Sequence, residues 1–102
     1  LAALAVGNAT FQTAADTRAN EIMQLFSHTR PDGRGLASIF QDYGLSYRAA
    51  GENIAMGQST PEQVVNDWMN SSGHRANILN ANYNTIAVGQ NGVHWVQLFA
   101  KF

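Results

Sequence analysis

The sequence predicts an α+β fold, a three-layer α-β-α sandwich in which a small antiparallel sheet lies between helices. Two segments have apolar residues at the three- and four-residue spacing of amphipathic helices. Two extended segments near the C-terminus are joined by a hairpin signal. The last extended segment is apolar on both faces, with Val93, Trp95 and Phe99 on one and Val96 and Leu98 on the other. A sheet buried on both sides needs helices on both sides.

Composition narrows the class of protein to one globular domain. The chain has 102 residues, of which 45% are hydrophobic and 13% charged, and its formal net charge is −1. This balance excludes a disordered tail and leaves no positive surplus for a phosphate backbone, so we expect no nucleic-acid partner. No apolar run approaches the roughly 20 residues of a membrane span. Because the chain lacks cysteine, disulfides, thiolate zinc sites and thiol nucleophiles are excluded.

The N-terminal segment Leu1–Val6 is apolar, but it lacks the positive charge of a signal peptide and the roughly 7–15 residues of its apolar core. We therefore expect the chain to begin inside a domain, with Leu1–Val6 packed on the core. Two candidate N-caps, Asn8 and Thr10, follow this segment and predict that a helix begins there.

The first predicted helix runs from these caps to about Phe26. Its apolar stripe comprises Ala15, Ala19, Ile22, Met23 and Phe26. The polar residues predicted to lie largely off this stripe are Asp16, Arg18, Asn20, Glu21 and Gln24. Pro31 and the Asp32-Gly33 turn then break the helical pattern, and a shorter helix is expected over residues 36–42.

The middle of the chain begins with a short strand, predicted over residues 53–56. Thr60, Pro61 and Gln63 form a capping-box start for the next helix. The predicted buried stripe of this helix comprises Val64, Val65, Trp68 and Met69.

The C-terminal part is predicted to hold one more helical turn and two strands. Gly73 ends the preceding helix, and Ser72 is a candidate cap for a turn that extends to Leu79. Strands are expected over residues 85–90 and 93–99. The Asn91-Gly92 pair between them favours a two-residue hairpin turn, because both residues tolerate positive φ.

Three ionisable side chains stand at the ends of predicted elements, where functional residues are often found. They are His28 after the first helix, Glu52 at the entry to the strand at 53–56, and His74 after the helix that carries Trp68. Such a set could hold a divalent metal such as zinc, with His28 and His74 as ligands, or supply an acid–base pair. A structural alternative stays open, in which Glu52 accepts backbone N–H bonds in a turn and His28 closes a loop.

Other polar and aromatic residues near these positions favour structural roles. Asn53 is expected to satisfy backbone groups, and both tryptophans are expected in the core. His94 alternates with apolar residues in the last strand and is expected to be structural or exposed. Ser71 lies close to His74, but no Gly-x-Ser-x-Gly or other standard catalytic motif surrounds it.

Five motifs follow one another along the chain. They are Phe26-Ser-His-Thr-Arg-Pro-Asp-Gly33, Gly51-Glu-Asn-Ile54, Trp68-Met-Asn-Ser71, Gly73-His-Arg-Ala-Asn-Ile-Leu79 and Trp95-Val-Gln-Leu-Phe99. In this order they resemble the bacterial branch of the CAP superfamily (cysteine-rich secretory proteins, antigen 5 and pathogenesis-related proteins). The resemblance extends from about Leu4 to Phe102. It implies an α-β-α sandwich, in agreement with the residue pattern, and a secreted or envelope-associated bacterial protein.

The resemblance also implies a cavity lined by two histidines and two acidic residues. His28, Glu52 and His74 match three of these positions, and Asn53 follows Glu52 in the same motif. Ser71 stands where the second acidic residue is expected, which removes one carboxylate from the cluster. The predicted cavity or ligand-binding residues are therefore His28, Glu52, Asn53, Ser71 and His74.

A second departure from the family pattern lies at the start of the chain. Similar domains carry another helix before the segment that matches residues 4–7. We therefore expect residues 1–102 to form a single CAP (SCP-like) domain without that first helix. Its absence predicts exposed apolar surface, which favours self-association or a partner.

Three functions stay open at this point. The resemblance favours a ligand-binding or interaction module of a secreted protein, whose cavity takes a small-molecule, lipid or envelope ligand, with or without a divalent metal. The first alternative is a metal-dependent hydrolase of peptide or cell-wall substrates, with Glu52 as general base. The second alternative is a structural assembly domain.

Overall fold

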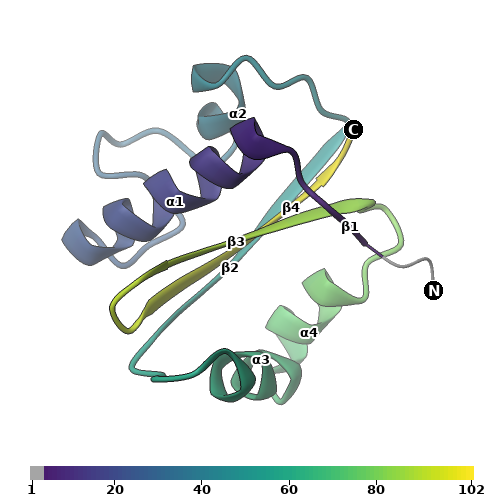
Figure 1. Cartoon of the computed structure of the whole chain (residues 1–102). Coiled ribbons are helices and arrows are strands. Elements are labelled where there is room, and N and C mark those ends of the chain that lie inside the picture. The colour runs from purple at the N-terminus through teal and green to yellow at the C-terminus, as the bar shows by residue number, and fades with distance from the viewer. Residues whose placement is uncertain (1–3) are drawn as a thin grey trace.

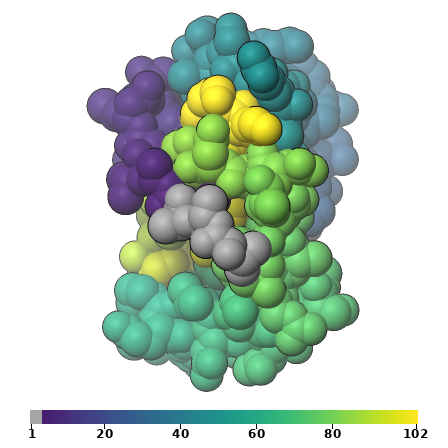
Figure 2. All heavy atoms as spheres, turned by 90° about the vertical axis from the view of Figure 1, so that its right-hand side faces the viewer, coloured from purple at the N-terminus to yellow at the C-terminus, as the bar shows by residue number. Residues whose placement is uncertain are grey.

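In residues 4–102, the part of the chain that the computed structural model describes, four strands form one sheet between two helical layers (Figure 1). The elements are β1 (Ala5–Val6), α1 (Ala9–Gln24), α2 (Ser38–Asp42), β2 (Ala49–Met56), α3 (Pro61–Met69), α4 (Ser72–Ile78), β3 (Thr85–Asn91) and β4 (His94–Lys101). Helices α1 and α2 lie on one side of the sheet, and α3 and α4 on the other. In the view turned by 90°, the C-terminal residues (yellow) come to the surface between the segments of α1 (purple) and α2 (teal) (Figure 2). The predicted α-β-α sandwich is therefore confirmed.

The sheet has the strand order β1-β3-β4-β2 and is mixed rather than purely antiparallel. β4 pairs antiparallel with β2 and with β3. The parallel strand is β1, which the sequence did not predict: the Ala5 N–H donates to the Asn84 carbonyl oxygen at 2.9 Å. The expected packing of Leu1–Val6 on the core is wrong for Val6, whose side chain is 86% exposed. The backbone pairing with β3, and not side-chain burial, holds β1 in place. Leu1–Ala3 lie outside the described residues.

Helix α1 begins at a predicted cap, because Oδ1 of Asn8 accepts a hydrogen bond from the Phe11 N–H at 2.9 Å. Its buried apolar residues, which pack against β3 and β4, are Phe11, Ala14, Ala15, Ala19 and Ile22. This packing is close, since a Cβ on Gly89 of β3 would collide with the backbone of Ala15. Small residues on both elements therefore let α1 lie directly on the sheet.

Two predictions about α1 are wrong. The helix ends at Gln24, and Met23 and Phe26, predicted in the apolar stripe, are both exposed. Arg18, predicted to lie off the stripe, is fully buried. Its position, seven residues after Phe11 and four before Ile22, places it on the buried line of the helix.

β2 is longer than predicted and begins at Ala49 rather than at residue 53. It pairs with β4 along its whole length, from Ala49 opposite Lys101 to Met56 opposite His94. Glu52 therefore lies inside a strand rather than at its entry. Helix α2 is shorter than predicted, at Ser38–Asp42.

β2 is an outer strand of the sheet, and side chains bind its outward carbonyl groups. Three donors each lie 3.2 Å from one oxygen: the Tyr83 hydroxyl on Ala50, Asn77 Nδ2 on Glu52, and Trp68 Nε1 on Ile54. The acceptors are alternate residues, as expected for one edge of a strand. This edge is thereby joined to α3, to α4 and to the loop before β3.

Helix α3 begins as predicted, with Oγ1 of Thr60 accepting from the Gln63 N–H at 3.2 Å. Gln63 Oε1 in return accepts from the Ser59 N–H, one residue before the cap. Of the predicted stripe, Val64 and Trp68 are buried, Met69 is half-buried and Val65 is exposed. The N-cap position of α4 is Ser71, one residue before the predicted cap at Ser72.

The hairpin between β3 and β4 is shifted by one residue from its predicted position. Asn91 is still paired with His94, so the two-residue loop is Gly92–Val93. Gly92 has a φ of 59°, whereas no non-glycine residue in the range 4–102 has a positive φ. A glycine at the first loop position is typical of a type II′ turn, and it leaves Val93 exposed at the tip.

Candidate functional site

Glu52 is the centre of a buried ion pair on the α1 side of the sheet. Its side chain is fully buried, as is that of Arg18 from α1. Arg18 Nε donates to Oε2 of Glu52 at 2.7 Å, and Arg18 Nη2 donates to Oε1 at 2.9 Å. This two-pronged geometry is the strongest form of an arginine–carboxylate pair. The carboxylate charge is therefore matched inside the protein.

His28 reaches the same carboxylate from the loop after α1. Its Nδ1 lies 2.9 Å from Oε1 of Glu52, while its side chain is 60% exposed. A hydrogen bond with Glu52 raises the pKa of His28, and burial and the positive charge of Arg18 offset this only in part. The site thus presents an accessible imidazole whose inner nitrogen is fixed.

The ion pair belongs to a longer network that joins α1, the loop at residues 27–35, α2 and β2. Along it, acids and arginines alternate in the order Glu52, Arg18, Glu21, Arg30, Asp42, Arg34 and Asp32. Burial favours a higher pKa for Glu21, but hydrogen bonds from Arg30 and Arg18 outweigh it, so the pKa of Glu21 is lowered. Hydrogen bonds from Arg34 and Arg30 hold the pKa of Asp42 well below its usual range. These acids therefore stay ionised at neutral pH and hold the loop in place.

Asn53 points to the opposite side of the sheet and is held by neutral groups. Its Nδ2 donates to Oε1 of Gln97 and to the His74 carbonyl oxygen, both at 3.0 Å. Its Oδ1 accepts from Asn77 Nδ2 at 2.9 Å. The prediction that Asn53 satisfies backbone groups is confirmed by the bond to the carbonyl of His74.

His74 and Ser71 lie together at the start of α4. Nδ1 of His74 is 2.8 Å from Oγ of Ser71, and both residues are half-buried. Ser71 holds the N-cap position, but its side chain binds the imidazole instead of a backbone N–H. The bond fixes the orientation of the His74 ring.

The five predicted site residues thus form two groups rather than one. Neighbouring residues of a strand point to opposite faces; Glu52 meets His28 on the α1 side, and Asn53 meets the His74 backbone on the α4 side. In the range 4–102 no hydrogen bond joins the side chains of His28 and Glu52 to those of Ser71 and His74.

The described residues do not fit a resident zinc ion. They contain no group of three or more His, Asp or Glu side chains that could hold a metal, and no enclosed pocket. Both oxygens of Glu52 already accept hydrogen bonds. Zinc binding by His28 and His74 therefore has no support in this geometry and stays a prediction.

Sequence reasoning missed three residues of these groups: Arg18, Asn77 and Gln97. Arg18 had a usable signal, because a charged residue on the buried line of a helix requires a buried acid as partner. Asn77 and Gln97 lie in two of the five motifs, but their partners could not be assigned, because these depend on strand register and on how α4 packs.

Comparison with known proteins decides the family. The profile described as "Cysteine-rich secretory protein family" (CAP) matches residues 3–99. The chain belongs to the CAP family. Over 76 residues this CAP chain is 50% identical to the uncharacterized protein YkwD of Bacillus subtilis and 33% identical to the uncharacterized membrane protein YlbC of the same organism. These matches include 72% and 74% of the chain, but only 30% and 22% of the two relatives.

Solved CAP structures share the fold over the whole chain. An extracellular protein with an SCP domain from Bacillus anthracis matches with a TM-score of 0.93 and 30% identity, over 100% of this chain and 35% of that one. An outer surface protein of Borrelia burgdorferi matches with a TM-score of 0.86 and 25% identity, over 99% of this chain and 79% of that one. A cysteine-rich secretory protein of Staphylococcus aureus has a TM-score of 0.84 at 19% identity, over 100% of this chain and 33% of that one, and shows the fold alone. In residues 4–102, no helix combines the length and the apolar character needed to cross a bilayer.

Proposed function

We propose that residues 1–102 act as a single CAP domain outside the cytoplasm and bind a ligand through the surface around His28. The relatives that support the location are those named as extracellular and outer surface proteins. The observation that supports binding is the state of His28: an accessible ring whose inner nitrogen is held by a fully buried carboxylate. A fixed, exposed imidazole can donate or accept a hydrogen bond with little loss of side-chain entropy on binding.

A binding role fits this geometry better than hydrolysis with Glu52 as general base. A general base must lie within hydrogen-bond reach of the water or substrate proton that it takes. The Glu52 side chain is fully buried, and its oxygens are occupied by Arg18 and His28. The imidazole of His28, by contrast, is accessible on this side of the sheet.

The binding proposal is tested by NMR titration of the 15N-labelled chain with soluble muropeptides from a Bacillus subtilis cell-wall digest. We expect saturable shifts centred on residues 27–29, lost in His28→Ala and kept in the control Arg48→Ala, which removes an exposed side chain away from this loop. Separate arms use phosphatidylglycerol vesicles and zinc chloride. If no arm gives shifts at residues 27–29, or if His28→Ala binds like the parent, the proposal fails.

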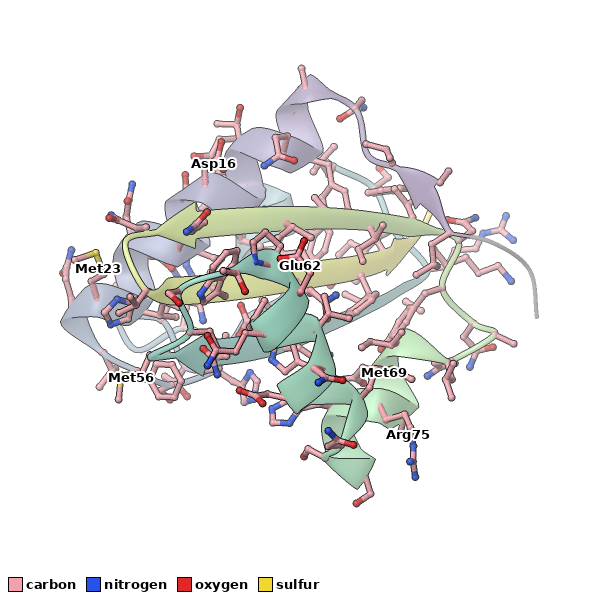
Figure 3. All side chains as sticks on the ribbon, turned by 60° about the horizontal axis from the view of Figure 1, so that its bottom comes forward. Asp16, Met23, Met56, Glu62, Met69 and Arg75 are labelled. Carbon is pink, nitrogen blue, oxygen red and sulfur yellow. The ribbon has the colours of Figure 1, made fainter. Side chains whose placement is uncertain are left out.

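Self-association stays a prediction with a separate test. The predicted surface is the face that a preceding helix would cover; the exposed Met23 and Met56 lie elsewhere, at the end of the molecule opposite β1 (Figure 3). Light scattering of the chain over a range of concentrations distinguishes a monomer from a dimer. A monomer at all concentrations would contradict the predicted self-association.

A further inference from the structure

We propose that Arg18 is a positioning residue for His28: acting through Glu52, it fixes the neutral imidazole as the Nδ1–H tautomer with Nε2 free for a ligand. This inference deepens the proposed function, since it assumes that His28 is the group that meets the ligand. The three residues come from three elements, α1, the following loop and β2, so only the folded chain brings them together.

The first step concerns the charge of Glu52. A carboxylate without access to water is costly unless it is paired and hydrogen-bonded. Arg18 meets both needs, because it places two N–H groups on the two oxygens and is itself fully buried. Without this pair, burial would favour the protonated carboxyl. Arg18 therefore keeps Glu52 in its ionised form.

The second step concerns the tautomer of His28. An ionised carboxylate only accepts hydrogen bonds, so the nitrogen that lies 2.9 Å from Oε1 must carry the proton. In neutral imidazole one nitrogen is a donor and the other an acceptor. With Nδ1 protonated toward Glu52, Nε2 keeps its lone pair. A protonated Glu52 could donate instead, and the ring would then take the opposite tautomer.

The third step concerns the backbone beside His28. Arg18 Nη2 also donates to the Ser27 carbonyl oxygen at 2.9 Å, and Nη1 donates to Oε1 of Glu21 at 2.9 Å. One guanidinium thus holds the acid that orients the imidazole and the residue that precedes it in the loop. A lysine has a compact charge and cannot make this set of directed bonds.

The test measures the tautomer by long-range 1H–15N correlation spectra of His28 at a pH where the ring is neutral, with a chelator and no ligand present. We expect Nδ1–H as the dominant form in the parent chain. Its share falls by more than half in Arg18→Met and in Glu52→Gln, and Arg18→Lys lies between Arg18→Met and the parent. The matched control is Arg48→Met, which removes an exposed arginine outside the network and retains the parent tautomer.

Two results would overturn the inference: a dominant Nε2–H tautomer in the parent, or a parent-like tautomer in Arg18→Met. If Arg18→Met does not fold, a parent-like tautomer in Arg18→Lys overturns the inference instead. A merely structural arginine would change stability but not the tautomer. The tautomer is measured without any ligand. The expected tautomer can therefore be found even if the muropeptide titration shows no binding, and binding can be found even if the tautomer differs, so the two proposals can be refuted independently.

Discussion

Two adjacent residues of β2, Glu52 and Asn53, anchor the two sides of the CAP sandwich by different means. Glu52 is held by a buried arginine and an accessible histidine, all of them ionisable. Asn53 is held by two amides and a main-chain carbonyl. The charged anchor requires every partner to be present in the correct protonation state. The amide anchor holds α4 with bonds that do not depend on pH.

The two anchors also differ in how far solvent can reach the side chains bonded to them. On the Glu52 side, the exposed ring of His28 is bonded directly to the buried carboxylate. On the Asn53 side, the amides of Asn53 and Gln97 stay buried. We therefore expect function to depend mainly on the charged side and architecture mainly on the amide side.

The largest effect is expected for Glu52→Ala, which leaves Arg18 buried without its main partner. Removing one member of a buried ion pair typically costs about 3–5 kcal/mol of unfolding free energy. Urea denaturation at pH 7 measures the loss. The control Asp16→Ala, on the exposed face of α1, should change stability by less than about 0.5 kcal/mol. A loss below about 1 kcal/mol for Glu52→Ala would refute the ion-pair anchor.

Asn53→Ala should cost less, about 1–3 kcal/mol, because it leaves neutral buried groups without partners. The loss should be the same at pH 6 and pH 8, since no ionisable side chain is removed. Asn66→Ala, on the exposed surface of α3, is the matched control. If Asn53→Ala proves more damaging than Glu52→Ala, the order of the two anchors is reversed.

Tyr83→Phe should cost about 0.5–1.5 kcal/mol, the usual net worth of one hydrogen bond. It removes the bond to the Ala50 carbonyl but keeps the ring stacked on Phe99. Tyr47→Phe serves as control, because its ring packs on Phe40 and no hydrogen bond of its hydroxyl is found in residues 4–102. Equal losses in both variants would show that the hydroxyl bond contributes nothing specific.

The smallest effect is expected from the titration of His28. Its pKa is raised in the folded state, so its contribution to stability is fully present below the unfolded value of 6.5 and is lost as pH rises through the folded value. The ring is largely exposed, which keeps the effect small. Denaturation at several points between pH 6 and 8 should therefore show a steeper loss for the parent than for His28→Asn. In a Glu52→Gln background the two slopes should coincide.

Local signals explain what the sequence could predict. Caps such as Asn8 and Thr60 act within three residues, so they could be placed without knowing the fold. The two-faced pattern of residues 93–99 correctly required helices on both sides of the sheet, although Val93 itself is exposed at the hairpin tip. Motif order supported the family before any geometry was known.

Long-range geometry explains what the sequence could not predict. β1 is held by pairing with a strand some 80 residues further along the chain, and its own two residues carry no strand pattern. Glu52 and Asn53 were predicted in one cavity, but strand alternation separates their side chains. The sequence predicted a strand that begins at residue 53, after Glu52. Because β2 includes both residues, their side chains must point to opposite faces of the sheet.

The bonds from Tyr83, Asn77 and Trp68 to the edge of β2 have a consequence for solubility. An exposed strand edge is a template on which another chain can add a strand, and this leads to aggregation or fibril growth. In this domain the carbonyl oxygens of Ala50, Glu52 and Ile54 are already occupied from within the same chain. An incoming strand would have to displace three side-chain donors before it could pair. The longer outer strand of the sheet is therefore protected against intermolecular β-pairing by residues of α3, α4 and the loop before β3.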